Sequence, residues 1–105
     1  MLDVIQAGYA LWDKRLKSQR ADGTITLIQS QKIIIVDTGL PKDKEKILST
    51  LQDFGQSPSD IDYVVCTHGD ADHTSNNNLF PKAKLIVGFD IYEGDRATFI
   101  LPHHT

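Results

Sequence analysis

Residues 61–73 read IDYVVCTHGDADH, and this stretch joins an apolar run to a polar one. The run from Ile61 to Thr67 is short, apolar and rich in β-branched residues, which is typical of a buried β-strand. Two imidazoles and two carboxylates follow it directly, at His68, Asp70, Asp72 and His73. A strand that ends in a loop of polar side chains is a common arrangement for a functional site.

The residue types in this loop favour metal binding. Residues two apart on an extended segment point to the same side, so His68 and Asp70 can converge on one ion. A turn after Asp70 would let Asp72 and His73 face a second ion. Imidazole nitrogen and carboxylate oxygen suit zinc, manganese or iron. The predicted metal ligands are therefore His68, Asp70, Asp72 and His73.

The chain before this loop predicts strands first and then a helix. We expect a strand over residues 4–9, a loop over 13–20, and a β-hairpin formed by 24–29 and 32–37. Apolar residues then recur at helical spacing from Ile47 to Phe54, and Gly55 is a typical helix stop.

The chain after the loop predicts one more helix and one more strand. We expect a short helix over residues 75–79, a buried strand at 85–87, and a weakly patterned tail from residue 89. The order of elements between residues 32 and 87 favours an α/β fold with an antiparallel hairpin at its front. The aromatic residues Tyr9, Trp12 and Phe54 are expected to pack in or against the core.

Composition limits the classes of function. The chain has 105 residues, 40% of them hydrophobic and 24% charged, which fits one globular domain. Its 11 basic and 14 acidic residues give a net charge of -3 without a block of basic residues. The charge signal for nucleic-acid binding is therefore weak, although charge alone does not exclude a nuclease.

The sequence lacks the features that are typical of secreted and membrane proteins. Cys66 is the single cysteine, so no intramolecular disulfide can form. The start of the chain lacks a basic segment followed by a long apolar one, and the longest aliphatic run is Ile33 to Val36. We expect a protein of the cytosol or nucleus with no membrane association.

The ligand loop and an earlier motif together resemble the metallo-beta-lactamase superfamily. Its pattern is His-x-His-x-Asp-His after a hydrophobic strand, with an earlier Asp-x-Gly that closes another strand. Residues 68–73 follow this pattern except at Asp70, and residues 37–39, Asp-Thr-Gly, match the earlier element. The resemblance implies an α/β fold, a four-layer αββα sandwich. Residues 1–105 would be a partial domain, the N-terminal half of the fold, truncated before the C-terminal half.

The resemblance also implies roles for individual residues. His68, Asp72 and His73 match ligands of the one or two zinc ions bound in the family, and Asp72 would act in catalysis by orienting or deprotonating the metal-bound water. Asp70 stands where the pattern has its second histidine, and this carboxylate would shift the metal preference toward manganese or iron. Asp37 would support the metal loop from outside the ligand set.

The function implied by the resemblance is metal-dependent hydrolysis. Within the superfamily, the likeness points to an endoribonuclease that acts on histone pre-mRNA 3' ends, with RNA as substrate and a homodimer as the assembly. The later ligands of the family have no counterpart here, and His103 and His104 are expected to be solvated rather than to replace them. We therefore expect this chain to bind at most one metal weakly and to be weakly active or inactive.

Two other functions remain open from the residues. The first is a non-catalytic interaction module or degenerate metal-binding domain, which would use the uncovered face of the half sandwich to bind a partner. The second is a phosphatase of the haloacid-dehalogenase type, because residues 70–74 match its Asp-x-Asp-x-Thr pattern. Such enzymes have their first Asp directly after a strand, whereas here residues 67–69 intervene, which disfavours this interpretation.

Overall fold

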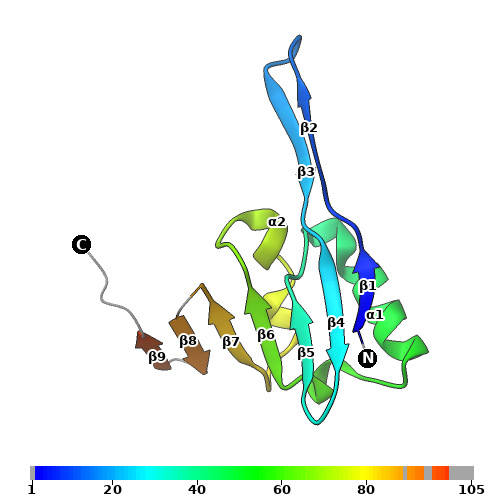
Figure 1. The fold of residues 1–105 in the computed structure, drawn as a ribbon, viewed down its shortest axis with the longest axis vertical. Coiled ribbons are helices and arrows are strands. Elements are labelled where there is room, and N and C mark those ends of the chain that lie inside the picture. The colour runs from blue at the N-terminus through cyan, green and yellow to red at the C-terminus, as the bar shows by residue number, and fades with distance from the viewer. Residues whose placement is uncertain (1, 89, 94–95, 100–105) are drawn as a thin grey trace.

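The computed structural model describes residues 2–88, 90–93 and 96–99, which form strands with helices packed on one side (Figure 1). The strands are β1 (Leu2–Gln6), β2 (Tyr9–Asp13), β3 (Ser18–Asp22), β4 (Ile25–Gln29), β5 (Ile33–Val36), β6 (Tyr63–Cys66), β7 (Lys84–Val87), β8 (Asp90–Glu93) and β9 (Arg96–Phe99). The helices are α1 (Lys44–Asp53) and α2 (Ala71–Thr74), with 3-10 turns at Pro41–Asp43, Pro58–Asp60 and Asn77–Leu79.

Seven of the strands form one mixed sheet in the order β1-β4-β5-β6-β7-β8-β9, while β2 and β3 pair only with each other. Strands β5, β6 and β7 run parallel, and the other neighbours in the sheet are antiparallel. Parallel neighbours need a crossover connection, and α1 and α2 lie in the two crossovers. The predicted α/β arrangement with an antiparallel hairpin at its front, β4 and β5, is confirmed.

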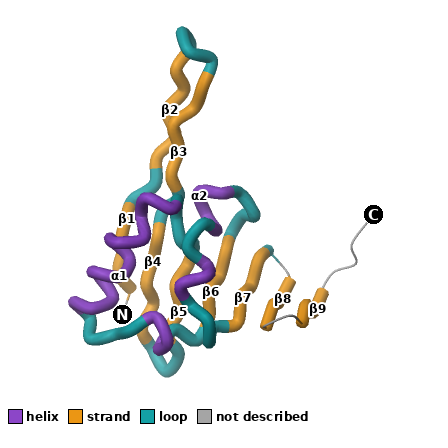
Figure 2. Tube along the Cα trace, turned by 180° about the vertical axis from the view of Figure 1, so that it is seen from behind, coloured by secondary structure: helices purple, strands orange, loops and turns teal. Residues whose placement is uncertain are grey.

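The core lies between the sheet and α1, which covers one face (Figure 2). Alternate residues of the strands point toward the helix, and Ile47 and Leu51 of α1, four residues apart, point back toward the sheet. All of the core side chains are at most 4% exposed: Ile25, Leu27, Ile35, Ile47, Leu51, Ile61, Val64, Cys66 and Phe80. Phe54 packs against this cluster, as predicted.

The opposite face of the sheet is not covered by any helix that the structure describes (Figures 1 and 2). The register places Ile28 beside Ile34, and Val36 beside Val65, on this face. These side chains are only half-buried. A helix layer on one face of a sheet whose other face is apolar is the arrangement expected of one half of an αββα sandwich.

The predictions for the first 22 residues need three corrections, of which the first is that the strand expected over residues 4–9 ends at Gln6. Residues 13–20 were expected to form a loop, but β2 and β3 form a projecting hairpin with a turn of only four residues, 14–17. The side chain of Asp13 holds this turn by accepting hydrogen bonds from the amides of Arg15 (2.9 Å) and Leu16 (3.0 Å). Trp12 is 62% exposed and Tyr9 39% exposed, and neither packs in or against the core, contrary to the prediction.

Two further elements differ from the prediction. The helix expected over residues 75–79 is a 3-10 turn at Asn77–Leu79, and the α-helical turn α2 lies earlier, directly after Asp70. The tail from residue 89, expected to be weakly patterned, contains β8 and β9. His103 and His104 lie outside the described residues. Within the described ranges, no helix combines the length and apolar character needed to cross a membrane.

Candidate functional site

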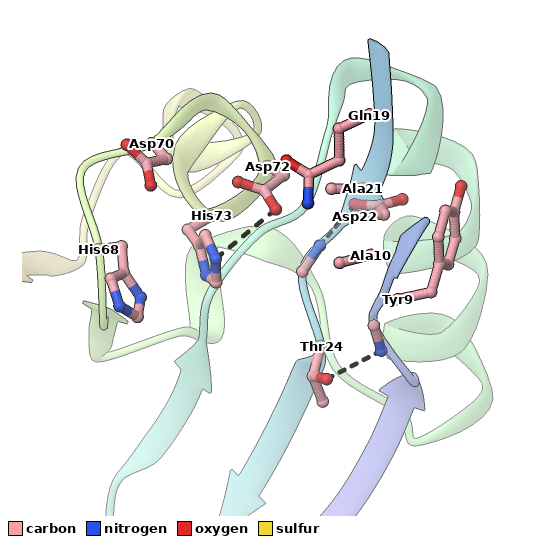
Figure 3. Close-up of a pocket in the computed structure, with 12 residues that line it drawn as sticks. Tyr9, Ala10, Gln19, Ala21, Asp22, Thr24, His68, Asp70, Asp72 and His73 are labelled. Atoms are coloured by element: carbon pink, nitrogen blue, oxygen red, sulfur yellow. Dashed lines mark hydrogen bonds and ion pairs between the residues drawn. The ribbon is translucent and has the colours of Figure 1, made fainter. Parts of the chain in front are cut away.

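The four predicted ligands line one cleft of about 570 Å³ (Figure 3). One wall is the loop after β6, at the carboxyl end of the parallel strands, where loops of α/β sheets commonly form binding sites. The other wall is the base of the β2–β3 hairpin and the segment that follows it. The residues of this second wall are Gly8, Tyr9, Ala10, Gln19, Ala21, Asp22, Gly23 and Thr24.

Three of the predicted ligands, His68, Asp72 and His73, lie side by side. The Oδ2 atom of Asp72 lies 3.6 Å from Nε2 of His73, and the imidazole ring of His68 lies 4.8 Å from that of His73, centroid to centroid. Asp70 lies at the outer end of the loop (Figure 3). Among the described residues, no three His, Cys, Asp or Glu side chains are placed together to hold a metal ion. The donors therefore have the chemistry that a metal needs, but they form only part of a ligand set.

Asp37 fastens both ends of the ligand loop. Its buried carboxylate accepts hydrogen bonds from the amide of Thr67 (2.8 Å), from the hydroxyl of Thr67 (2.7 Å) and from Nδ1 of His73 (3.0 Å). The residue adopts φ +62°, a left-handed conformation that Asp tolerates better than most residues. Asp37 therefore contacts the loop from behind and does not face the cleft as a lining residue.

The contact with Asp37 also determines the tautomer and the pKa of the His73 ring. Because Nδ1 donates to the carboxylate, Nε2 carries the free lone pair of the neutral ring and faces Asp72. Partial burial lowers the pKa of His73, but the hydrogen bond and charge of Asp37 outweigh it, and Asp72 and Asp70 add to them. The pKa of His73 is consequently raised above its ordinary value of 6.5.

We expect the metal-free protein to become less stable, relative to a His73→Gln variant, as the pH rises from below 6.5 through the raised pKa of His73. A pKa raised by folding means that protonated His73 stabilises the folded state. This contribution is complete below the unfolded-state pKa near 6.5 and is lost as the pH rises through the higher folded-state pKa. Thermal unfolding midpoints of both proteins, measured in EDTA across this range, test it. A difference that stays constant with pH would contradict the assignment.

Thr38 and Asn76 hold the loops of the site together. The sequence placed Thr38 in the Asp-Thr-Gly motif without giving it a role, and it did not single out Asn76. The side-chain amide of Asn76 donates to the carbonyls of Thr38 and Leu40, both at 2.7 Å, and both side chains are buried. The amide of Thr38 donates to the carbonyl of His73 (3.0 Å). Asn76 is one of three consecutive asparagines, and nothing in their order shows which of them is buried.

Gly23 is the point at which the hairpin wall touches the ligand loop. Its amide donates to the carbonyl of Asp72 (3.2 Å), and a Cβ at this position would lie 2.4 Å from that oxygen. Its own carbonyl accepts a hydrogen bond from the side chain of Gln6 (3.0 Å). Beside it, the buried carboxylate of Asp22 pairs with Lys42 at 2.8 Å. A glycine after an aspartate indicates a turn, but the sequence holds no sign of this close approach.

Comparison with known sequences identifies relatives over most of the chain. The profile of the metallo-beta-lactamase superfamily matches residues 20–99. A protein named metallo-beta-lactamase domain-containing protein 1 from Xenopus laevis is 42% identical over 73 residues, which cover 70% of this chain and 31% of that protein. The human protein of the same name is 33% identical over 114 residues, covering 83% and 43%. The chain therefore spans less than half the length of these relatives.

Solved structures show the same fold. A protein from Thermotoga maritima, described as a metallo-beta-lactamase, matches with a TM-score of 0.66 and 25% identity, over 80% of this chain and 41% of that one. BJP-1, a subclass B3 metallo-beta-lactamase of Bradyrhizobium japonicum, matches with a TM-score of 0.52 and 29% identity, over 59% and 25%. In both cases the sheet and helix layers described above correspond to a minority of the matched chain.

Proposed function

The chain belongs to the metallo-beta-lactamase superfamily, and from that premise we propose that the protein is a metal-dependent hydrolase whose reaction takes place in the cleft beside His68, Asp72 and His73. The observation that carries the proposal is the pairing of Asp37 with His73. A buried carboxylate behind a histidine, with the free ring nitrogen beside a second carboxylate, is an arrangement that orients histidines as metal ligands.

The residues of the cleft divide the work of such a reaction. Asp72 and His73 would hold the metal, with His68 beside them, and the bound zinc, manganese or iron would activate water and polarise the scissile group. The carboxylate of Asp72 can accept a proton from a water in the cleft and orient it. Asp37 keeps Nε2 of His73 directed at the cleft, and its two bonds to Thr67 fix the start of the loop.

The finer proposal is that the substrate is RNA, cut by an endoribonuclease that acts on histone pre-mRNA 3' ends. This assignment rests on the resemblance of the sequence. Association into a homodimer stays a prediction. The cytosol or nucleus remains the proposed compartment, which is supported by the single cysteine, Cys66. Burial raises the pKa of the Cys66 thiol, so that it stays protonated and does not serve as a nucleophile.

The test is hydrolysis by the purified protein loaded with Zn²⁺ or Mn²⁺, of a single-stranded RNA and of a small chromogenic phosphodiester. We expect both to be cleaved slowly, because the described residues form only part of a ligand set, and Asp72→Asn to slow this cleavage by roughly a further tenfold or more, because an amide cannot accept the proton. Asp53→Asn is the matched control, since Asp53 is an exposed carboxylate at the end of α1. Equal rates for the two variants, or no cleavage by the metal-loaded protein, would contradict the proposal.

A further inference from the structure

The β2–β3 hairpin projects from the domain as a separate two-stranded ribbon (Figures 1 and 2). An isolated ribbon of this size is only marginally stable in water. Here its base is fixed to the domain, because the amide of Gly8 donates to the hydroxyl of Thr24 (2.8 Å) and Asp22 pairs with Lys42. The outer half is exposed on both faces. The hairpin is therefore an anchored arm that presents its outer half to solvent.

The arm separates charge within the molecule. Residues 13–20 contain four basic side chains and one acidic one, whereas the rest of the chain has 13 acidic and seven basic side chains. Lys14, Arg15 and Lys17, which we call the basic tip, lie in the turn and are exposed. None of the three forms an ion pair with any residue that the structure describes. A net charge of -3 thus conceals a local surface that attracts anions.

Trp12 lies between the basic tip and the cleft. In the ribbon, Trp12 pairs with Gln19 and Ala10 pairs with Ala21, and cross-strand partners and alternate residues share a face. Ala10, Gln19 and Ala21 line the cleft, so Trp12 lies on the same face, one layer farther out. Its side chain is 62% exposed, although an indole normally packs in the core of a small domain. The ribbon therefore carries an aromatic surface next to the cleft wall.

We propose that this arm is a docking site for single-stranded RNA, in which phosphates contact the basic tip, a base stacks on Trp12 and the strand continues into the cleft at His68–His73. The inference rests on the proposed hydrolase function and names the part of the protein that binds its substrate. Cations combined with an exposed aromatic side chain are the means by which proteins bind single strands without reading sequence. The arm supplies both on one path that leads to the predicted ligands.

An anionic membrane is the main competing ligand, and the layout of the arm disfavours it. Segments that bind a membrane surface gather their apolar side chains on one face and carry Lys and Arg on the opposite, polar face. The exposed apolar residues of the arm form no such face, because Leu11 and Trp12 are neighbours on β2 and point to opposite faces of the ribbon, while Leu16 lies in the turn with the three cations.

The experiment measures binding of a fluorescent single-stranded RNA of about 15 nucleotides to the purified protein by anisotropy, in EDTA so that no cleavage occurs. We expect salt-sensitive binding that weakens roughly tenfold in Lys14→Glu/Arg15→Glu and about fivefold or more in Trp12→Ala. The control is Lys32→Glu/Lys82→Glu, which changes the net charge equally at two exposed lysines outside the arm. Circular dichroism checks that every variant is folded.

Several outcomes would overturn the arm proposal. One is equal RNA affinity in the two double variants, and another is binding of the arm to anionic vesicles with no affinity for RNA. The hydrolase proposal fails separately, because the small phosphodiester can enter the cleft without contacting the basic tip or Trp12. Loss of RNA binding in Lys14→Glu/Arg15→Glu with unchanged hydrolysis of that phosphodiester supports both. A protein that binds RNA through the arm and hydrolyses nothing refutes only the hydrolase.

Discussion

Replacement of Asp37 by Ala is expected to lower the free energy of unfolding by about 3 kcal/mol and to release the loop that carries the predicted ligands. The change removes three hydrogen bonds, to the amide and hydroxyl of Thr67 and to Nδ1 of His73. It leaves the amide of Thr67 without its partner. Alanine is also disfavoured at φ +62°, and holding it in this conformation costs roughly 1 kcal/mol more than holding Asp or Asn there.

Urea unfolding measures this loss, and Asp37→Asn is the matched control. Asparagine has the shape of aspartate, tolerates the left-handed conformation and can still accept a hydrogen bond from the amide of Thr67. The Asp37→Asn variant should therefore lose less than half as much free energy of unfolding as Asp37→Ala. It removes the negative charge that raises the pKa of His73, and an NMR titration of the ring should show that pKa fall. A loss of less than about 1 kcal/mol in the alanine variant would show that Asp37 does not hold the loop.

The parts of the fold that could be predicted from the sequence are those in which burial of one face makes apolar residues recur at a regular spacing. Residues 25–29 and 63–66 contain buried apolar side chains because one of their faces packs against the helices, and α1 repeats Ile47 and Leu51 because one face packs on the sheet. The β2–β3 arm has no such pattern, since both faces of its outer half are exposed. The same exposure explains why Trp12 was wrongly expected to pack in the core.

The helical turn α2 was misplaced for a different reason. Its four residues bury no side chain, so they carry no apolar face to recognise. Tertiary hydrogen bonds hold the turn instead, from the amide of Thr38 to the carbonyl of His73 (3.0 Å) and from the amide of Ser75 to the carbonyl of Gly39 (3.0 Å). These partners lie far away in the sequence, so the residues of α2 alone do not indicate them.

The candidate site likewise has residues that could be predicted from the sequence and residues that could not. His68, Asp70, Asp72 and His73 could be singled out because their side chains are chemically distinctive and close in sequence. The residues that hold them, above all Asn76 and Gly23, are of ordinary types, and their roles depend on segments more than 30 residues away for Asn76 and almost 50 for Gly23. Asp70 lies after the three residues that follow β6, which is not the position that a phosphatase nucleophile requires.

Replacement of Gly23 by Ala is expected to destabilise the protein by about 2 kcal/mol and to push the hairpin wall away from the ligand loop. The new Cβ would lie 2.4 Å from the carbonyl oxygen of Asp72 and 3.2 Å from Nδ1 of His73. Asp72 cannot move aside freely, because its neighbour His73 is bonded both to Asp37 and to the amide of Thr38. The clash must therefore break the bond between Gly23 and Asp72 or displace both ligands.

Gly69→Ala is the control for this prediction, because Gly69 lies in the same loop and a Cβ there would meet nothing within 4 Å. Urea unfolding and calorimetric titration with Zn²⁺ should show a loss of stability and of metal affinity in Gly23→Ala and little change in Gly69→Ala. If the two variants behave alike, the hairpin does not rest on the loop. In that case the arm could not direct a substrate toward Asp72 and His73, because its position relative to them would not be fixed.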